Sequence, residues 1–219
     1  MKFLTIIAFL AIANSCNQDP SSSNENVASN DEEPIEVATM QGREKAYFAS
    51  GCFWCVEEIY ESVKGVDEAI SGYSGGTTKN PTYEQSNTGN TGHAEANEII
   101  YDPTVVSFET LVDVYFASQN IEQVNGQGPD RGSQYRSIVF YQNDEQKKII
   151  NDKIAQLEAD GYDVAAEVKP FQKFWVAEDY HQDYAERNPS NGYIQNVSIP
   201  RWRRFAKEMP EVIKDGVSH

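Results

Sequence analysis

The sequence predicts an α+β fold, a two-layer arrangement of helices on a mixed β-sheet in a single domain. Two observations support this prediction. Apolar stretches of strand length alternate along the chain with segments whose apolar residues recur every three or four positions, as on one face of a helix. Residues 43–219 also have the length of one domain with a single core, and they contain no internal repeat and no second linker.

The expected strands are short apolar stretches that end at turn-forming residues. Gly51 closes the first, Ser74-Gly75-Gly76 follows the second, and Asp102-Pro103 stops the third. The expected strands are residues 45–50, 67–73, 96–101, 137–141 and 165–169. Helices are expected in three of the four intervals between these strands.

Helical periodicity predicts amphipathic helices in these three intervals, the first of them beginning near Cys52 and ending at Gly65. The residues that mark their buried faces are Val56, Ile59, Tyr60 and Val63 in the first, Phe108, Leu111, Val112 and Tyr115 in the second, and Ile149, Ile150, Ile154 and Leu157 in the third, which covers residues 144–160. From Phe171 onward the sequence predicts mostly irregular structure. We expect the basic and aromatic cluster at 201–205 to be a solvated C-terminal face.

The N-terminus has the layout of a lipoprotein signal peptide. The positive Lys2 precedes an apolar run from Phe3 to Ala13, and Asn14-Ser15 then leads to Cys16. This run is too short to cross a bilayer, which takes about 20 residues. We therefore expect residues 1–15 to be removed and Cys16 to carry lipid, which would anchor an exported protein to a bacterial membrane on its periplasmic or cell-surface side. An ordinary secretory signal cut before Cys16 is the alternative.

Residues 16–42 are expected to form a disordered acidic tether. They are rich in Ser, Asn, Asp, Glu and Pro, and such a segment cannot bury enough apolar surface to offset the entropy lost on ordering. The net charge of the whole chain is −16, which argues against nucleic-acid binding, because that binding rests on neutralising phosphates.

The chain has three cysteines, so lipid on Cys16 would leave only Cys52 and Cys55 in the domain. At this spacing on the first turn of a helix the two thiols can meet. A stabilising disulfide is one interpretation, but the loop-entropy model gives so small a ring only about 2 kcal/mol, against roughly 3 kcal/mol for a fifteen-residue loop. A redox role also fits, because the positive end of the helix dipole stabilises a thiolate and lowers its pKa, although Glu57 and Glu58 partly oppose this effect.

Two other kinds of ligand are disfavoured. A structural zinc site takes four ligands, and beyond the cysteine pair the domain offers only His93, His181 and His219. The glycines of residues 72–76 lack the Gly-Lys-Ser/Thr of a phosphate-binding loop, so we expect them to form a turn.

Phe53 and Trp54 lie between the two cysteines, where the sequence predicts an exposed helix entrance. They are either core residues or the walls of an apolar pocket beside a nucleophilic sulfur, suited to a small group such as a methyl. The residues alone do not decide between these two interpretations.

The motifs of the chain strongly resemble those of the type A peptide methionine sulfoxide reductases, in the same order and spacing over roughly residues 45–189. The matching blocks are Gly51-Cys52-Phe53-Trp54, Gly72-Tyr73-Ser74-Gly75-Gly76, Asn80-Pro81-Thr82-Tyr83, Thr91-Gly92-His93-Ala94-Glu95-Ala96, Tyr101-Asp102-Pro103, Gln127-Gly128-Pro129-Asp130, Gln134-Tyr135-Arg136-Ser137 and Ala177-Glu178-Asp179-Tyr180-His181-Gln182. The resemblance implies an enzyme that reduces methionine (S)-sulfoxide, free or in proteins, without a cofactor and with an external thioredoxin-like reductant. In an exported protein this activity would repair oxidised exported proteins.

The resemblance also implies roles for individual residues. The Cys52 thiolate would attack the sulfoxide sulfur, and Phe53 and Trp54 would hold the methyl group attached to that sulfur.

Four further residues owe their implied roles to the resemblance alone. Glu95, kept protonated by burial, would give a proton to the sulfoxide oxygen, which is a poor leaving group unless its growing charge is neutralised. Tyr83 and Tyr135 would donate hydrogen bonds to that oxygen, and Asp130 matches a family residue that helps order the substrate site.

The chain departs from the family pattern at two places. Many relatives have glycine at the position of Cys55 and keep resolving cysteines in a C-terminal tail, whereas this tail has none. Cys55 would therefore resolve the sulfenic acid on Cys52 as a disulfide, which we expect at the surface of a helix entrance, accessible to the reductant. The second departure is Ser118-Gln119-Asn120-Ile121, where relatives commonly have a His-Asp-Pro block, and no function is assigned to it.

Two alternatives stay open from the residues alone. A thioredoxin-like thiol–disulfide exchange lipoprotein would share the order of strand, cysteine pair and helix, but it would leave methionine sulfoxide untouched. A binding protein on a lipid tether would need no nucleophile, so replacing Cys52 would change its stability at most. For the enzyme, a tethered monomer is sufficient.

Overall fold

The computed structural model describes residue 38 and residues 41–218. The predicted signal peptide, Cys16 and nearly all of the predicted tether lie outside these described residues. Within the described part of the chain, no helix is both long and apolar enough to cross a membrane.

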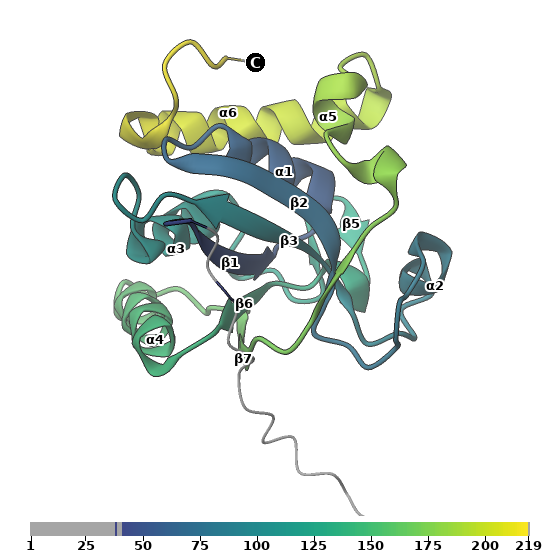
Figure 1. The fold of residues 1–219 in the computed structure, drawn as a ribbon, viewed down its shortest axis with the longest axis horizontal. Coiled ribbons are helices and arrows are strands. Elements are labelled where there is room, and N and C mark those ends of the chain that lie inside the picture. The colour runs from purple at the N-terminus through teal and green to yellow at the C-terminus, as the bar shows by residue number, and fades with distance from the viewer. Residues whose placement is uncertain (1–37, 39–40, 219) are drawn as a thin grey trace, which may run out of the picture. The chain divides into compact units, whose positions relative to one another are not determined.

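A six-stranded sheet forms the centre of the domain, with the strand order β7-β6-β1-β3-β2-β8 (Figure 1). Its strands are β1 (Glu44–Ala49), β2 (Val66–Ser74), β3 (Ala94–Tyr101), β6 (Ile138–Tyr141), β7 (Glu167–Pro170) and β8 (Phe174–Val176). Neighbouring strands are antiparallel except β6 and β7, which are parallel, so the sheet is mixed as predicted. A separate two-stranded ribbon joins β4 (Gly126–Gln127) and β5 (Asp130–Arg131).

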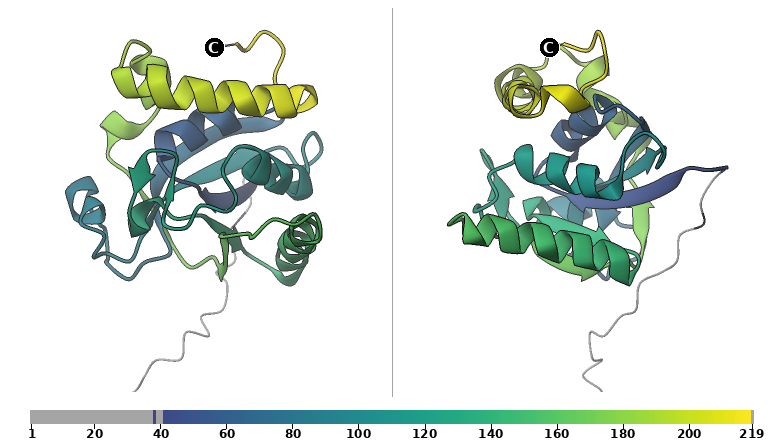
Figure 2. Two further views of the ribbon diagram at one scale, coloured as in Figure 1. Left: turned by 180° about the vertical axis from the view of Figure 1, so that it is seen from behind. Right: turned by 90° about the vertical axis from the view of Figure 1, so that its left-hand side faces the viewer.

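The longer helices pack on one face of this sheet. The α-helices are α1 (Phe53–Glu61), α2 (Tyr83–Asn87), α3 (Phe108–Ala117), α4 (Asp144–Ala159), α5 (Tyr184–Arg187) and α6 (Ile199–Glu208). Short 3₁₀ turns are η1 (Ser133–Tyr135), η2 (Asp179–His181) and η4 (Pro210–Val212), and η3 (Ile194–Ser198) is a π-helical turn. The α6 helix lies along α1, and α3 lies beside α4 (Figures 1 and 2). The predicted α+β fold with helices on a mixed sheet is therefore confirmed.

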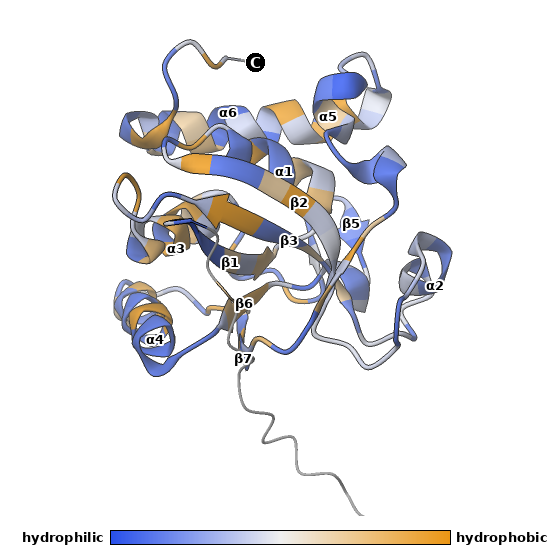
Figure 3. Cartoon of the chain, viewed as in Figure 1, coloured by the Kyte–Doolittle hydropathy of each residue, from blue (hydrophilic) through white to orange (hydrophobic). Residues whose placement is uncertain are grey.

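The alternation of side chains along β1 explains this arrangement. Ala46 and Phe48 point into a core shared with α1, α3, α4 and α6, whereas Tyr47 and Ala49 point to the other face, where Phe171 stacks on Tyr47. Blue and orange residues alternate around α4, as expected of a helix with one buried face (Figure 3).

The prediction for the C-terminal quarter is wrong. This segment forms α5, the π-helical turn η3 and α6, and only part of it is irregular. Trp202 and Phe205 are buried in the main core, and Arg201 is buried beside them, so the predicted solvated face is limited to Arg203 and Arg204. The charged residues between the aromatic ones concealed the helical period.

Candidate active site

The turn between β1 and α1 places Cys52 at the N-terminus of the helix. Gly51 has a φ of +75°, and a Cβ there would lie 2.5 Å from the Cβ of Gln127. The carbonyl of Cys52 accepts hydrogen bonds from the backbone N–H groups of Cys55 (3.2 Å) and Val56 (3.4 Å). Only glycine suits both the backbone conformation and the space before the cysteine.

A Gly51→Ala substitution is therefore expected to destabilise the fold by about 2 kcal/mol or more, from the left-handed backbone and the clash together. Denaturant unfolding measures this cost. Gly161→Ala is the matched control, since Gly161 has a φ of +98° and nothing within 4 Å of an added Cβ. Equal losses in both variants would show that the contact with Gln127 has no effect.

Glu95 lies in β3, opposite Tyr73 of β2, and its side chain faces the start of α1. The residue is 2% exposed, and its Oε2 accepts a hydrogen bond of 3.0 Å from the backbone N–H of Phe53. Burial raises the pKa of Glu95 to about 8, against the opposing effect of that hydrogen bond, and the nearby Asp130 and Cys55 raise it further. A carboxyl group that holds its proton at neutral pH therefore stands beside the cysteine turn.

The structure brings Cys52 and Cys55 together as free thiols that hydrogen-bond to each other. They are 6% and 1% exposed, so the prediction of an exposed helix entrance is wrong. The cover comes from the C-terminal segment, in which Tyr193, Val197 and Ser198 pack around the pair.

Burial also changes the predicted electrostatics of the two thiols. Desolvation, followed by the hydrogen bond with Cys55, raises the pKa of Cys52 well above its ordinary value. The pKa of Cys55 is lowered to about 6, first by the hydrogen bond from Cys52 and then, against the effect of burial, by Arg201, Ser198 and Tyr193. The prediction that the helix dipole lowers the pKa of Cys52 is therefore wrong, because burial outweighs it.

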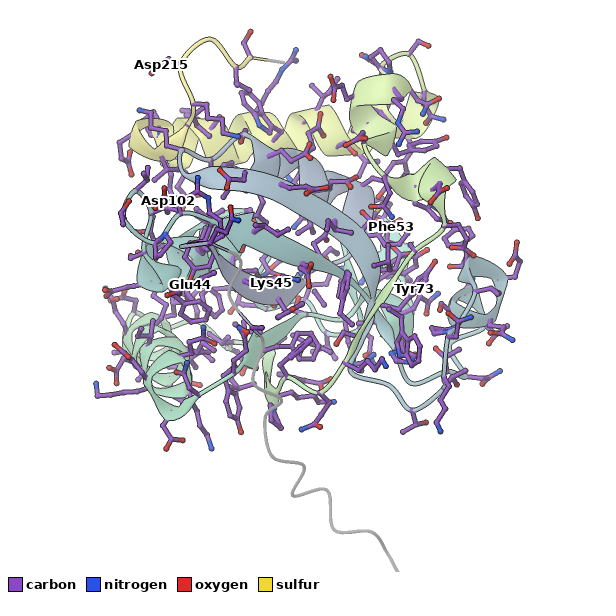
Figure 4. The ribbon with its side chains drawn as sticks, viewed as in Figure 1. Glu44, Lys45, Phe53, Tyr73, Asp102 and Asp215 are labelled. Atoms are coloured by element: carbon purple, nitrogen blue, oxygen red, sulfur yellow. The ribbon has the colours of Figure 1, made fainter. Side chains whose placement is uncertain are left out.

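Phe53 and Trp54 contribute to an aromatic cluster beside the cysteine pair. Phe53 is buried against Tyr73 and His181, with ring centroids 5.9 and 4.9 Å away (Figure 4). Trp54 is partly exposed, stacks on Tyr184 at 3.8 Å, and donates a hydrogen bond of 3.2 Å from Nε1 to Nδ1 of His181. Phe53 is thus a packed residue, while Trp54 offers an aromatic surface to a ligand.

The two predicted hydrogen-bond donors also lie at this site. Burial raises the pKa of Tyr135, and Glu95, Tyr83, Cys52 and Asp130 raise it further, because all four are close to the phenol. A partly buried tyrosine beside a nucleophile can present its hydroxyl group to an oxygen of a bound ligand.

Asp130 completes the group of residues named from the resemblance. It lies in β5 and accepts a hydrogen bond from the hydroxyl of Tyr193. All eight predicted residues of the domain, namely Cys52, Phe53, Trp54, Cys55, Tyr83, Glu95, Asp130 and Tyr135, therefore lie in one region, whereas Cys16 is outside the described residues.

Several residues of the site were not identified from the sequence. Glu178 accepts hydrogen bonds from the Tyr73 hydroxyl (3.1 Å) and the Tyr83 backbone N–H (2.9 Å), so it fixes both aromatic residues. Glu178 and His181 lie in a block that matches the family, but the block alone assigned them no role. Tyr193 and Ser198 carried no signal in the sequence, and Arg201 was expected on a solvated face.

The second departure from the family pattern has a structural explanation. The side-chain oxygen of Gln119 accepts hydrogen bonds from Ser50 (2.9 Å), Gln127 (3.0 Å) and Ser137 (2.7 Å). Gln119 therefore joins the turn before Cys52 to the loop that carries Asp130, and its role is structural.

Metal binding has no support within residues 41–218, where no group of three or more His, Cys, Asp or Glu side chains is arranged to hold an ion. His93 instead accepts a hydrogen bond of 3.1 Å from the Gly76 backbone at Nδ1, and its Nε2 lies 2.7 Å from the Thr78 carbonyl. It therefore fixes the turn after β2.

Comparison with known proteins identifies the family. A family profile described as peptide methionine sulfoxide reductase matches residues 44–212. The chain is 46% identical over 172 residues to the peptide methionine sulfoxide reductase MsrA of Pasteurella multocida, covering 78% of this chain and 99% of that protein. It is 44% identical over 185 residues to MsrA 1 of Rhodopirellula baltica, covering 84% of this chain and 96% of that protein.

Solved structures agree with the sequence matches. Methionine sulfoxide reductase A of Corynebacterium diphtheriae aligns with a TM-score of 0.64 at 33% identity, over 69% of this chain and 78% of that one. Mxr1 of Saccharomyces cerevisiae in its reduced form aligns with a TM-score of 0.65 at 29% identity, over 70% of this chain and 91% of that one. These matches decide against the two alternative interpretations, a disulfide-exchange protein and a binding protein. The chain belongs to the peptide methionine sulfoxide reductase A family of oxidoreductases.

Proposed function

We propose that this enzyme reduces the S form of methionine sulfoxide, free or in proteins, by attack of the Cys52 thiolate on the sulfoxide sulfur. The observation that supports this most directly is the position of Glu95 near Cys52, where it accepts a hydrogen bond from the Phe53 backbone and burial raises its pKa to about 8. A sulfoxide can be reduced by a thiol only if its oxygen receives a proton as the bond to sulfur breaks. The site offers a nucleophile and an acid side by side.

The remaining residues position the substrate in this proposal. Phe53 and Trp54 form an apolar wall for the methyl group, and the partly exposed face of Trp54 is the surface that contacts it. Tyr83 and Tyr135 donate hydrogen bonds to the sulfoxide oxygen, where negative charge grows in the transition state. Asp130 holds Tyr193, which packs edge-on against Trp54.

The second half of the reaction restores the thiols. Attack leaves Cys52 as a sulfenic acid, and the Cys55 sulfur condenses with it to give a disulfide and water. A thioredoxin-like reductant then reduces the disulfide, and the enzyme needs no bound cofactor and works as a monomer.

We also propose an exported location, which rests on the N-terminal sequence alone. Residues 1–15 would be cut off, and Cys16 would carry the lipid that holds the enzyme at a bacterial membrane, so that its substrates are oxidised exported proteins. Mass spectrometry of the protein from its host tests this, because lipid adds a large mass to the N-terminal peptide. An N-terminus at Cys16 without lipid contradicts the anchor.

The substrate is tested with separated S and R forms of a methionine sulfoxide peptide. We expect reduction of the S form only, because only one of the two enantiomers can place its oxygen toward Glu95 while its methyl group contacts Trp54. The Cys52→Ser variant is the control for background reduction. Activity on the R form alone would refute the proposal.

A further inference from the structure

The Cys55 sulfur lies in a pocket that the C-terminal segment builds around it. The π-helical turn Ile194–Ser198 places the Ser198 hydroxyl 2.9 Å from the Cys55 Sγ, and Ser198 itself is 1% exposed. This is a short contact for a sulfur atom, and hydrogen bonds shorten when the acceptor is charged. π-helical turns are rare and occur frequently at functional sites.

A buried cation lies next to this pocket. Arg201 of α6 is 6% exposed and donates hydrogen bonds only to neutral oxygens, the carbonyls of Ser118 (2.7 Å) and Ser50 (2.8 Å) and the Ser50 hydroxyl (2.8 Å). Among the described residues no carboxylate forms an ion pair with it. A buried guanidinium without a counter-charge is costly, so an anion nearby stabilises it.

Four other ionisable groups lie near Cys55 and could supply negative charge beside Arg201. Burial raises the pKa of Glu58 to about 7 and that of Glu95 to about 8, so both hold a proton for part or most of the time near neutral pH. Asp130 accepts a hydrogen bond from the Tyr193 hydroxyl, and burial raises its pKa while Arg201 is near enough to oppose that rise, so Asp130 is a second, more distant counter-charge that forms no ion pair with Arg201. The remaining neighbour is Cys52, whose thiol donates a hydrogen bond to Cys55.

We propose that Ser198 and Arg201 form a binding site for the thiolate of Cys55, so that the reduced enzyme carries its charge on the resolving cysteine and not on the nucleophile. This inference rests on the proposed function of Cys52 and Cys55. It makes Ser198 and Arg201 positioning residues for the closing and opening of the disulfide.

In the proposed reaction, the thiols of Cys52 and Cys55 supply the two electrons that reduce the sulfoxide. Cys52 passes its thiol proton to the Cys55 thiolate as its sulfur attacks the sulfoxide sulfur, and Glu95 protonates the sulfoxide oxygen. The oxygen then transfers to the Cys52 sulfur as its bond to the methionine sulfur breaks, so Cys52 becomes a sulfenic acid and methionine leaves reduced. Cys55 then attacks the sulfenic acid on Cys52. The S–S bond forms, the S–O bond breaks, and the oxygen leaves as water with the proton from Cys55.

A dithiol reductant supplies the two electrons that restore the pair. It attacks Cys52, the more exposed of the two sulfurs, and expels Cys55 as the thiolate that its site binds. One proton of the dithiol goes to Cys52 and the other returns to Glu95, while the reductant becomes a disulfide.

The full chain tests this by ultraviolet titration of thiolate absorbance. Cys52→Ser leaves Cys55 as the only thiol of the pair, and Cys55→Ser leaves Cys52, so we expect the midpoint of the first variant to be the lower. Adding Ser198→Ala to Cys52→Ser is expected to raise the midpoint by about one pH unit or more, since a hydrogen bond to a charged group is lost. Ser62→Ala is the matched control, because Ser62 is a buried serine at the far end of α1 whose hydroxyl donates a hydrogen bond to the Ile59 carbonyl.

Arg201 is tested in the same background by exchange for lysine, which keeps the charge, and for glutamine, which removes it. We expect the lysine variant to keep the lower midpoint and the glutamine variant to lose it. An unchanged midpoint in Ser198→Ala, or a lower midpoint for Cys52 than for Cys55, overturns the inference.

Single-turnover kinetics separate this inference from the proposed function. In Ser198→Ala with both cysteines present, the amount of methionine formed in the first turnover is expected to equal that of wild type, since the hydroxyl does not touch the substrate. Closure of the disulfide at pH 6 is expected to slow several-fold and to recover at pH 9. Absence of methionine in the wild type would contradict the proposed function, whereas normal closure in the variant would contradict only the role of Ser198.

Discussion

Replacing Cys55 with serine is expected to leave the enzyme able to reduce one equivalent of methionine sulfoxide and unable to recycle with thioredoxin. The sulfenic acid on Cys52 would persist, because Cys55 is the only other cysteine among the described residues and lies beside Cys52. Quenched-flow assay of methionine, with and without reductant, measures both phases. Steady turnover should fall by more than about a hundredfold, while the amount formed in the first turnover stays the same.

Two controls define this result. Cys16→Ser removes the third thiol and is expected to recycle normally, since the proposed chemistry does not involve that residue. Cys52→Ser is expected to abolish even the first turnover. If Cys55→Ser recycles at the wild-type rate, the resolving role of Cys55 is wrong.

The buried position of Cys55 shows why part of the site was beyond sequence reasoning. The spacing of the two cysteines predicted correctly that the thiols meet at the start of α1. Their burial depends on Tyr193 and Ser198, which lie 138 and 143 positions from Cys55 along the chain. No local pattern reports a contact of such range, and the π-helical turn that makes it follows no regular hydrophobic period.

The sheet and the first helices were easier to predict, because each depends on its own residues. The alternation along β1 and the periodic apolar face of α3 each report which side is buried. By contrast, α6 buries Arg201 together with Trp202 and Phe205, so its buried face includes a charged residue that a hydrophobic period excludes. Glu95 is one of 34 acidic residues, and only the resemblance to a family distinguished it from surface charge.

Replacing Glu95 with glutamine is expected to lower the rate of the first turnover by roughly 10² to 10⁴, the usual contribution of a general acid. Glutamine keeps the size of the side chain and an oxygen that can accept the hydrogen bond from the Phe53 backbone, so the fold should be preserved. Glu98→Gln is the matched control on the same strand, because Glu98 faces Tyr47 and Lys45 rather than the cysteines. A first turnover at the wild-type rate in Glu95→Gln would exclude Glu95 as the proton donor.

The pH dependence of the same step gives a second measurement of Glu95. The acid works only in its protonated form, and burial raises its pKa to about 8, so the wild-type rate should be maintained up to that pH and fall about tenfold per unit above it. The Glu95→Gln variant has no proton to lose at this position, so its lower rate should not show that decline. Folding keeps this proton on a buried carboxyl group, so the stability that Glu95 contributes is fully present below its ordinary pKa of 4.5 and is lost progressively as the pH rises to about 8. Unfolding measured at each pH therefore separates deprotonation of Glu95 from loss of the fold. A fall in the wild-type rate that follows unfolding and not the titration of Glu95 would contradict its role as the proton donor.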